Sequence, residues 1–225
     1  MTSLVFDDER GYADFATFVA RARSLDSEGA MRLQAVGVTL AVHVQVLPGR
    51  GLLAEGGVTG MRAMALGQPT DLDVVVPLAA LADRVARHPE GIELSVPPMT
   101  VTAPWASITP PRDGWEPVGE VDEDELVVAA RAGIEEVALG ATSAGSATSA
   151  TPTASPADAT LGAPAVGALR QAVWGRLTPT APPVPAGAAF AAYVLGFLAP
   201  QGRSRVLARG RWVRLAATHG HVLVR

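Results

Sequence analysis

The sequence predicts an α+β fold with a mostly antiparallel sheet and flanking helices, on three observations. Residues 36–46 alternate between apolar and polar side chains, as a strand does when one of its faces meets solvent. Residues 14–25 carry apolar side chains at spacings of three and four, which is the period of an amphipathic helix. Residues 204–225 alternate again and contain the turn signals Arg209-Gly210 and His219-Gly220, so they predict a three-stranded β-meander.

The remaining elements follow from the same two periods. The alternation of residues 31–35 has the opposite phase, so a strand that begins there needs a bulge near Gly37. Asp122 and Glu125 are placed as the capping box of a helix. Six prolines exclude most regular structure from residues 97–117. We expect further strands at 61–66, 71–76 and 92–96, and helices at 77–87, 122–138, 164–177 and 186–199.

The chain is expected to consist of three parts. Residues 140–163 are built almost wholly of Ala, Ser, Thr, Pro and Gly, and such a segment buries too little apolar surface to offset its ordering entropy. We therefore predict an α+β domain at 1–139, a flexible linker at 140–163 and a basic region at 164–225. The helix pair and meander of that last region are winged-helix-like.

Composition limits the chemistry of this 225-residue chain. It contains no cysteine, and all 18 of its basic residues are arginine, so disulfides, thiolate metal sites, cysteine nucleophiles and lysine chemistry are excluded. No cofactor and no metal site is predicted. The first residues lack the basic and apolar stretches of a signal peptide, which predicts a cytoplasmic protein. The uncharged run 177–202 is interrupted by prolines and is too short to span a membrane.

Charge is divided unevenly along the sequence. All 22 acidic residues and ten arginines lie at or before Asp158, for a net charge of −12, and the last 67 residues carry eight arginines and no acid, for +8. A basic segment attracts polyanions, but it can equally dock on the acidic part of its own chain. A nucleic-acid or anion surface would use the arginines of the meander: Arg203, Arg205, Arg209, Arg211 and Arg214.

Two tryptophans stand in the proline-rich stretch and are candidates for partner contact. Trp105 and Trp115 flank Arg112, and large rings in irregular segments usually anchor something. They either contact another protein or hold the loop on the chain's own sheet. The leading hypothesis is a non-enzymatic interaction protein that binds a protein partner or itself, with nucleic-acid binding through the basic region as the alternative.

One enzymatic alternative rests on carboxylates. Asp71 and Asp73 alternate on a strand and could chelate one magnesium ion, with Glu93 as a third ligand, which resembles the site of nucleotidyltransferases. The glycine turn that precedes the pair in that family is missing here. Polar residues at an exposed strand edge explain the two aspartates equally, so we prefer a protein without catalytic residues.

Four segments resemble parts of an uncharacterised actinobacterial protein family with no assigned activity: residues 103–119, 185–197, 210–215 and 220–225. The resemblance covers most of the chain outside the linker. It implies a bacterial cytoplasmic protein and assigns a role to no residue.

Overall fold

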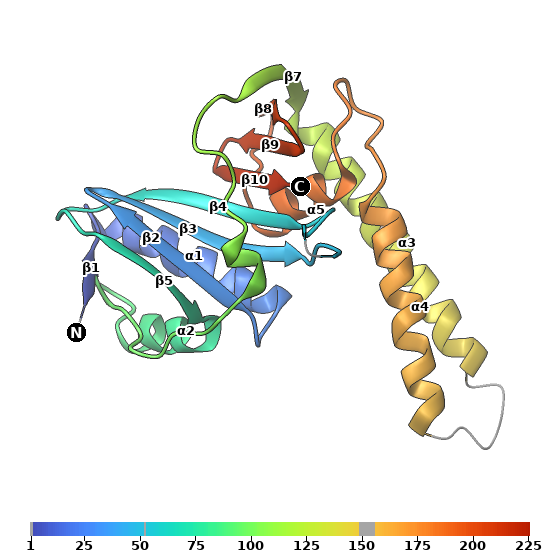
Figure 1. Ribbon diagram of the computed structural model, residues 1–225, viewed down its shortest axis with the longest axis horizontal. Coiled ribbons are helices and arrows are strands. Elements are labelled where there is room, and N and C mark those ends of the chain that lie inside the picture. The colour runs from blue at the N-terminus through green and yellow to red at the C-terminus, as the bar shows by residue number, and fades with distance from the viewer. Residues whose placement is uncertain (1, 52, 149–155) are drawn as a thin grey trace.

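The computed structural model describes residues 2–51, 53–148 and 156–225 (Figure 1). The helices are α1 (Glu9–Leu25), α2 (Leu78–Arg87), α3 (Glu123–Thr148), α4 (Pro156–Trp174) and α5 (Ala186–Val194), with a 3₁₀ helix η1 (Pro104–Ser107). The strands are β1 (Ser3–Val5), β2 (Ala30–Val36), β3 (Thr39–Leu47), β4 (Val58–Ala65), β5 (Leu72–Pro77), β6 (Glu93–Ser95), β7 (Glu116–Asp122), β8 (Arg203–Arg209), β9 (Trp212–Ala217) and β10 (Gly220–Val224). These elements confirm the α+β class.

One large antiparallel sheet unites the two ends of the chain. Within the described residues it has eight strands in the order β5-β2-β3-β4-β10-β9-β8-β7, and a separate two-stranded sheet pairs β1 with β6. The junction is the antiparallel pair of β4 and β10, in which Gly60 lies opposite Val222. The acidic and basic parts of the sequence are therefore joined by backbone hydrogen bonds.

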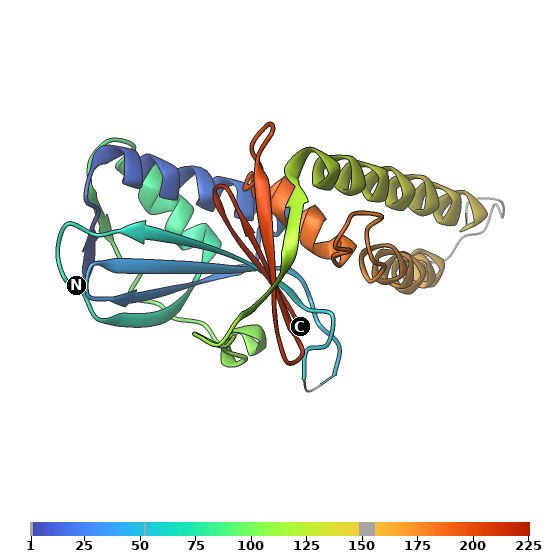
Figure 2. The ribbon, with the colours of Figure 1, turned by 90° about the horizontal axis from the view of Figure 1, so that it is seen from above.

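The two faces of the sheet are covered differently. Helices α1, α2 and α5 lie on one face, and the proline-rich loop, residues 97–115 with η1, crosses the other (Figure 2). Because side chains alternate along a strand, Leu33 and Val42 point toward the helices, and Arg32 and His43 point toward the loop. We call these surfaces the helix face and the loop face.

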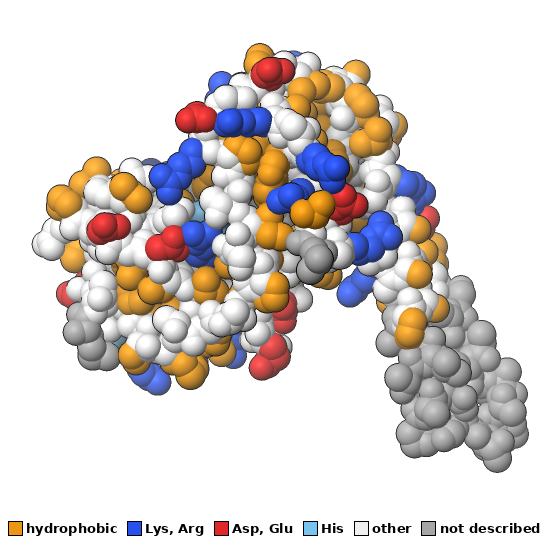
Figure 3. All heavy atoms as spheres, in the orientation of Figure 1, with side chains coloured by type: hydrophobic (Ala, Val, Ile, Leu, Met, Phe, Trp, Pro, Cys, Tyr) orange, Lys and Arg blue, Asp and Glu red, His pale blue; other side chains and the backbone are white. Residues whose placement is uncertain are grey.

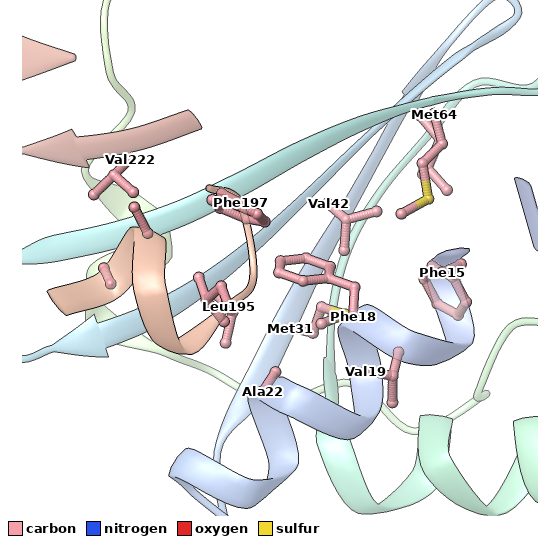
Figure 4. Close-up of a cluster of buried hydrophobic side chains, with 14 of the residues drawn as sticks. Phe15, Phe18, Val19, Ala22, Met31, Val42, Met64, Leu195, Phe197 and Val222 are labelled. Atoms are coloured by element: carbon pink, nitrogen blue, oxygen red, sulfur yellow. The ribbon is translucent and has the colours of Figure 1, made fainter. Parts of the chain in front are cut away.

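The helix face carries one continuous core. Phe18 of α1 packs against Phe197, which follows α5, with ring centroids 5.6 Å apart. Figure 4 shows these rings together with Leu195, Val42 and Val222. Since both halves of the sequence contribute to this cluster, they are packed together and do not form separate cores.

The phase change near Gly37 is a hairpin turn, so the predicted bulge in one long strand is wrong. Gly37 has a φ of +60° and lies between β2 and β3, which pair from Val36 opposite Thr39 onward. Val36 and Val38 flank the turn and are 64% and 54% exposed. Reversing the chain at this point produces the same change of alternation as a bulge, so the pattern alone does not separate the two.

The predicted linker is helical at both ends. Residues 140–148 continue α3, residues 156–163 belong to α4, and 149–155 lie outside the described residues. The two helices lie side by side and extend away from the sheet (Figure 1). The meander is confirmed as β8, β9 and β10, but the winged-helix comparison is not, because β10 is an inner strand of the sheet. No helix in the described ranges is long and apolar enough to cross a bilayer.

Candidate binding groove

One functional candidate is an apolar groove where α4 meets the ends of β3, β4 and β10. Its volume is about 470 Å³. Apolar side chains from the strands and from α4 form its walls: Val46, Leu47, Val58, Trp174, Val213 and Val224. Trp174 is only 6% exposed and stacks on Phe190 with ring centroids 4.3 Å apart, so one wall is a fixed aromatic surface.

Arginines rim this groove. Arg50, Arg170, Arg211 and Arg225 line it together with a single acidic side chain, Glu55. Glu55 is held by Arg211, with Oε1 2.8 Å from Nη1. In the described part of the chain no ion pair engages the other three arginines, so the rim carries uncompensated positive charge. We refer to this site as the arginine groove, and Figure 3 shows arginines gathered around apolar side chains in this region.

Backbone contacts bring the rim together from distant parts of the sequence. Arg50 and Glu55 close the loop after β3 by exchanging two backbone hydrogen bonds of 2.8 and 2.9 Å. The carbonyl of Arg225 accepts from Gly56 N–H, and the amide of Arg225 donates to Gly57 at 3.1 Å. The guanidinium of Arg225 lies over the Trp212 ring at 5.4 Å, and its buried Nε has no hydrogen-bond partner.

The predicted arginine surface is divided by ion pairs. Arg203 pairs with Glu120 at 3.2 Å, Arg209 with Asp113 at 2.8 Å, and Arg211 with Glu55. All three carboxylates come from the acidic part of the sequence. Arg205 and Arg214 have no carboxylate partner among the described residues, and they lie on the loop face. The five arginines therefore do not form one open basic face.

Of the two unpaired arginines, Arg214 is partly buried, whereas Arg205 is exposed. Its Nη2 approaches the ring nitrogens of His221 at 3.2 and 3.3 Å. Burial and the neighbouring Arg205 lower the pKa of Arg214. Burial lowers the pKa of His221 to about 4, helped by Arg214 and Arg205, so the imidazole is neutral near pH 7 and accepts a hydrogen bond from Arg214.

The tryptophans of the proline-rich loop contact the chain's own sheet. Trp105 lies in η1, which is fixed to the sheet by Arg32 Nη1 donating to the Ala106 carbonyl at 3.0 Å. The indole of Trp115 donates to the Pro111 carbonyl at 3.0 Å, and Arg214 stacks over its ring at 5.9 Å. The loop is thus anchored from both ends. Arg112 is exposed between them and makes no ion pair with the described residues.

The three candidate magnesium ligands are not brought together. Asp73 on β5 is engaged by Arg32, with Nε–Oδ1 and Nη2–Oδ2 distances of 2.7 and 2.6 Å. The Arg32 guanidinium lowers the pKa of Asp73. Asp71 is exposed before β5, whereas Glu93 lies on β6 of the two-stranded sheet. Within residues 2–51, 53–148 and 156–225 no three histidine or carboxylate side chains are grouped to hold a metal ion.

Sequence reasoning missed two features of these sites. Trp174 forms one wall of the arginine groove, but in the sequence it is indistinguishable from the other apolar residues of its helix. His43 was expected on a solvated strand face, yet it is only 8% exposed because the proline-rich loop covers it. The one available signal was that the loop's two tryptophans required a surface to cover.

Two family models together match nearly the whole chain. Residues 110–225 match a domain of unknown function (DUF8185), and residues 1–107 match another domain of unknown function (DUF8010). The boundary between the matches separates β1–β6 from β7–β10, so each match includes four strands of the large sheet. Neither the curated proteins nor the solved structures compared with the chain gave a match.

Proposed function

Because the chain belongs to the DUF8185 family, whose name assigns no activity, we propose its function from geometry: it is an interaction protein that holds an acidic, amphipathic segment of a protein partner in the arginine groove. The observation that carries this proposal is the combination of an apolar wall with a rim on which, among the described residues, three of four arginines have no ion pair. Actinobacterial origin and a cytoplasmic location remain parts of the proposal, as the sequence predicts.

The apolar part of the groove selects for an apolar side of the ligand. Val46, Leu47 and Val213 are partly exposed in front of the buried Trp174, and they offer a surface that a helix with leucine-type side chains on one face would cover. Fixed aromatic surfaces of this kind are frequent centres of binding energy in protein interfaces. We therefore expect the partner segment to insert its apolar face toward Trp174.

The charged part of the groove selects for acid. Arg50 and Arg170 would each face a carboxylate on the polar side of that segment. Arginine binds carboxylates with two parallel hydrogen bonds, and positive rims steer acidic partners during encounter. Partner affinity is therefore expected to fall as salt concentration rises.

The same lining supports binding over catalysis. The titratable side chains of the groove are its four arginines and Glu55, and Glu55 is held by Arg211. Arginine keeps its proton in proteins, so it does not act as a general acid or base at neutral pH. The groove thus offers recognition groups without a residue suited to proton transfer.

A pair of designed peptides tests the proposal. Both carry leucines on one helical face, and the opposite face carries glutamates in one peptide and lysines in the other. Fluorescence anisotropy should show binding of the acidic peptide only. Arg170→Glu should weaken that binding at least about tenfold, since it replaces attraction by repulsion at the rim.

Two further variants make the experiment specific. A Cβ built on Gly167 meets nothing within 4 Å, so Gly167→Leu places a side chain at the groove and should also weaken binding of the acidic peptide. Arg203→Glu is the matched control, because Arg203 is exposed on β8 outside the groove. Equal binding of both peptides, no binding of either, or an unchanged affinity in Arg170→Glu would refute the proposal.

Nucleic acid is the second candidate, because the unpaired arginines could also bind phosphates. A random-sequence DNA duplex added to the same assay separates the two. Binding of the duplex that survives Gly167→Leu and weakens steeply with salt would favour nucleic acid over an acidic protein segment.

A further inference from the structure

A second cavity lies on the loop face of the sheet, beneath the proline-rich loop. Its volume is about 180 Å³, and the loop residues Pro110, Arg112 and Trp115 cover strand residues that include His43 and Arg214. Neighbouring side chains of β9 and β10 point to opposite faces, so Val213 and Val224 line the arginine groove, whereas Arg214 and Leu223 line this cavity. The loop cavity is therefore separate from the arginine groove.

Buried polar atoms around the loop cavity lack partners. His43 is 8% exposed, and its buried Nδ1 makes no hydrogen bond. The buried Nε of Arg214 also has no partner. Polar groups removed from water cost free energy when they are left unpaired, so two such groups on the lining of one cavity point to a ligand that supplies acceptors.

The charges around the cavity identify that ligand as an anion. Arg32 and Asp73 neutralise each other through two hydrogen bonds, and the neutral His221 accepts from Arg214. Arg112 and Arg214 then remain as positive side chains on the lining without a carboxylate among the described residues. Burial of Arg214 near Arg205 makes a compensating negative charge favourable.

We propose that the loop cavity binds the oxyanion group of a small molecule, a phosphate or a carboxylate, between Arg112 and Arg214. His43 supplies a further donor in the tautomer that carries its proton on Nδ1. With a volume of about 180 Å³ the cavity has room for a free phosphate or a small carboxylate. Trp115 and Met61 provide apolar surface for the part of the ligand that carries the oxyanion.

Titration of the full chain with inorganic phosphate and, separately, with benzoate tests this site. Isothermal titration calorimetry measures affinity, and NMR of the histidine rings and the tryptophan indoles reports the place of binding. We expect at least one of the two anions to bind and to shift the ring signals of His43 and the indole signal of Trp115. Stronger binding of phosphate would identify a phosphate ligand, and stronger binding of benzoate a carboxylate.

Variants decide whether the binding uses the proposed residues. Arg214→Gln and Arg112→Gln should each weaken anion binding at least about tenfold. Because Arg112 is exposed, its replacement should leave the fold intact, and a loss of binding in that variant would not result from unfolding. Arg203→Gln on β8, outside both cavities, should leave anion binding and the shifts of the His43 and Trp115 signals unchanged. The proposal is overturned if neither anion shifts the two signals, or if Arg112→Gln and Arg203→Gln bind equally. The arginine groove proposal is unaffected by either result.

Discussion

Glu123 offers the sharpest test of how the start of α3 is fastened to the C-terminal part of the sheet. Its side chain is fully buried at the start of α3 and accepts hydrogen bonds from three separate segments. Ala199 N–H donates to Oε2 at 2.6 Å, Ser204 Oγ to Oε1 at 2.8 Å, and Thr218 N–H to Oε1 at 2.9 Å. We predict that Glu123→Gln destabilises the protein although it preserves the shape of the side chain.

The magnitude follows from these donors. A backbone N–H points at each carboxylate oxygen, so the amide nitrogen of glutamine must face either Ala199 or Thr218, whichever way the side chain is turned. One buried donor is then left without an acceptor, which costs about 1–3 kcal/mol. The remaining bonds lose their charge-assisted strength. Together these effects predict a loss of about 2–4 kcal/mol in the free energy of unfolding.

Urea denaturation followed by circular dichroism measures this loss, with Asp124→Asn as the control. Asp124 is exposed and accepts one bond of 3.2 Å from Gln201 N–H, so its replacement should change the free energy of unfolding by no more than about 0.5 kcal/mol. A Glu123→Gln variant as stable as Asp124→Asn would refute the view that this carboxylate ties three segments together.

Three further predictions concern the loop face and the sheet junction. The pKa values of His43 and His221 are lowered from 6.5 to about 4, so both rings stay neutral in the folded protein where the unfolded chain would bind protons. The resulting stabilisation should be complete above about pH 6.5 and be lost as the pH falls toward 4, by up to about 3 kcal/mol for each ring. Thermal melts of His43→Gln should therefore depend less on pH than those of the unaltered protein. Gly60→Ala should cost about 1–3 kcal/mol in urea denaturation, because the new Cβ would lie 2.1 Å from a methyl carbon of the buried Leu195; unchanged stability would mean that this contact relaxes freely. Trp115→Ala should cost about 2 kcal/mol and leave the sedimentation coefficient unchanged, whereas a stable variant with altered association would identify the ring as a protein contact.

The periodicity of the sequence predicts most strands and most helices, because each depends on local alternation, but it does not predict β1 or β7. The prediction failed for a segment of small residues, because small side chains suit both a flexible linker and two closely packed helices. The small residues at 140–148 predict a linker, yet they continue α3, and Gly133 and Gly140 lie against Trp174 and Leu169 of α4. Small side chains allow two helices to approach closely, and that benefit depends on a partner helix that no local pattern displays.

The sequence shows which residue types could form the candidate sites, but it does not show which of them meet in the folded protein. Arg211 meets Glu55 across 156 positions of sequence, and this pairing exists only because β10 joins β4. His43 was placed correctly on the face opposite the core, but its burial depends on a loop whose path is not encoded in strand alternation. Long-range topology therefore decides which charged groups remain free.

About half of the positive charge in the C-terminal part is compensated by ion pairs within the fold. Four of the eight C-terminal arginines pair with carboxylates that precede Asp158, and these contacts fasten the basic part to the acidic part: Arg176 to Glu136, Arg203 to Glu120, Arg209 to Asp113 and Arg211 to Glu55. Among the described residues the other four, Arg170, Arg205, Arg214 and Arg225, have no such partner. Paired surface arginines contribute little to binding another molecule, since their charge is already compensated. The unpaired ones differ in their places: Arg170 of α4 lines the arginine groove, Arg225 borders it and stacks on Trp212, and Arg205 and Arg214 lie on the loop face. Arg170 and Arg225 border the arginine groove and Arg214 lines the loop cavity, which is the physical reason to seek acidic ligands at these two places and not along the whole basic segment.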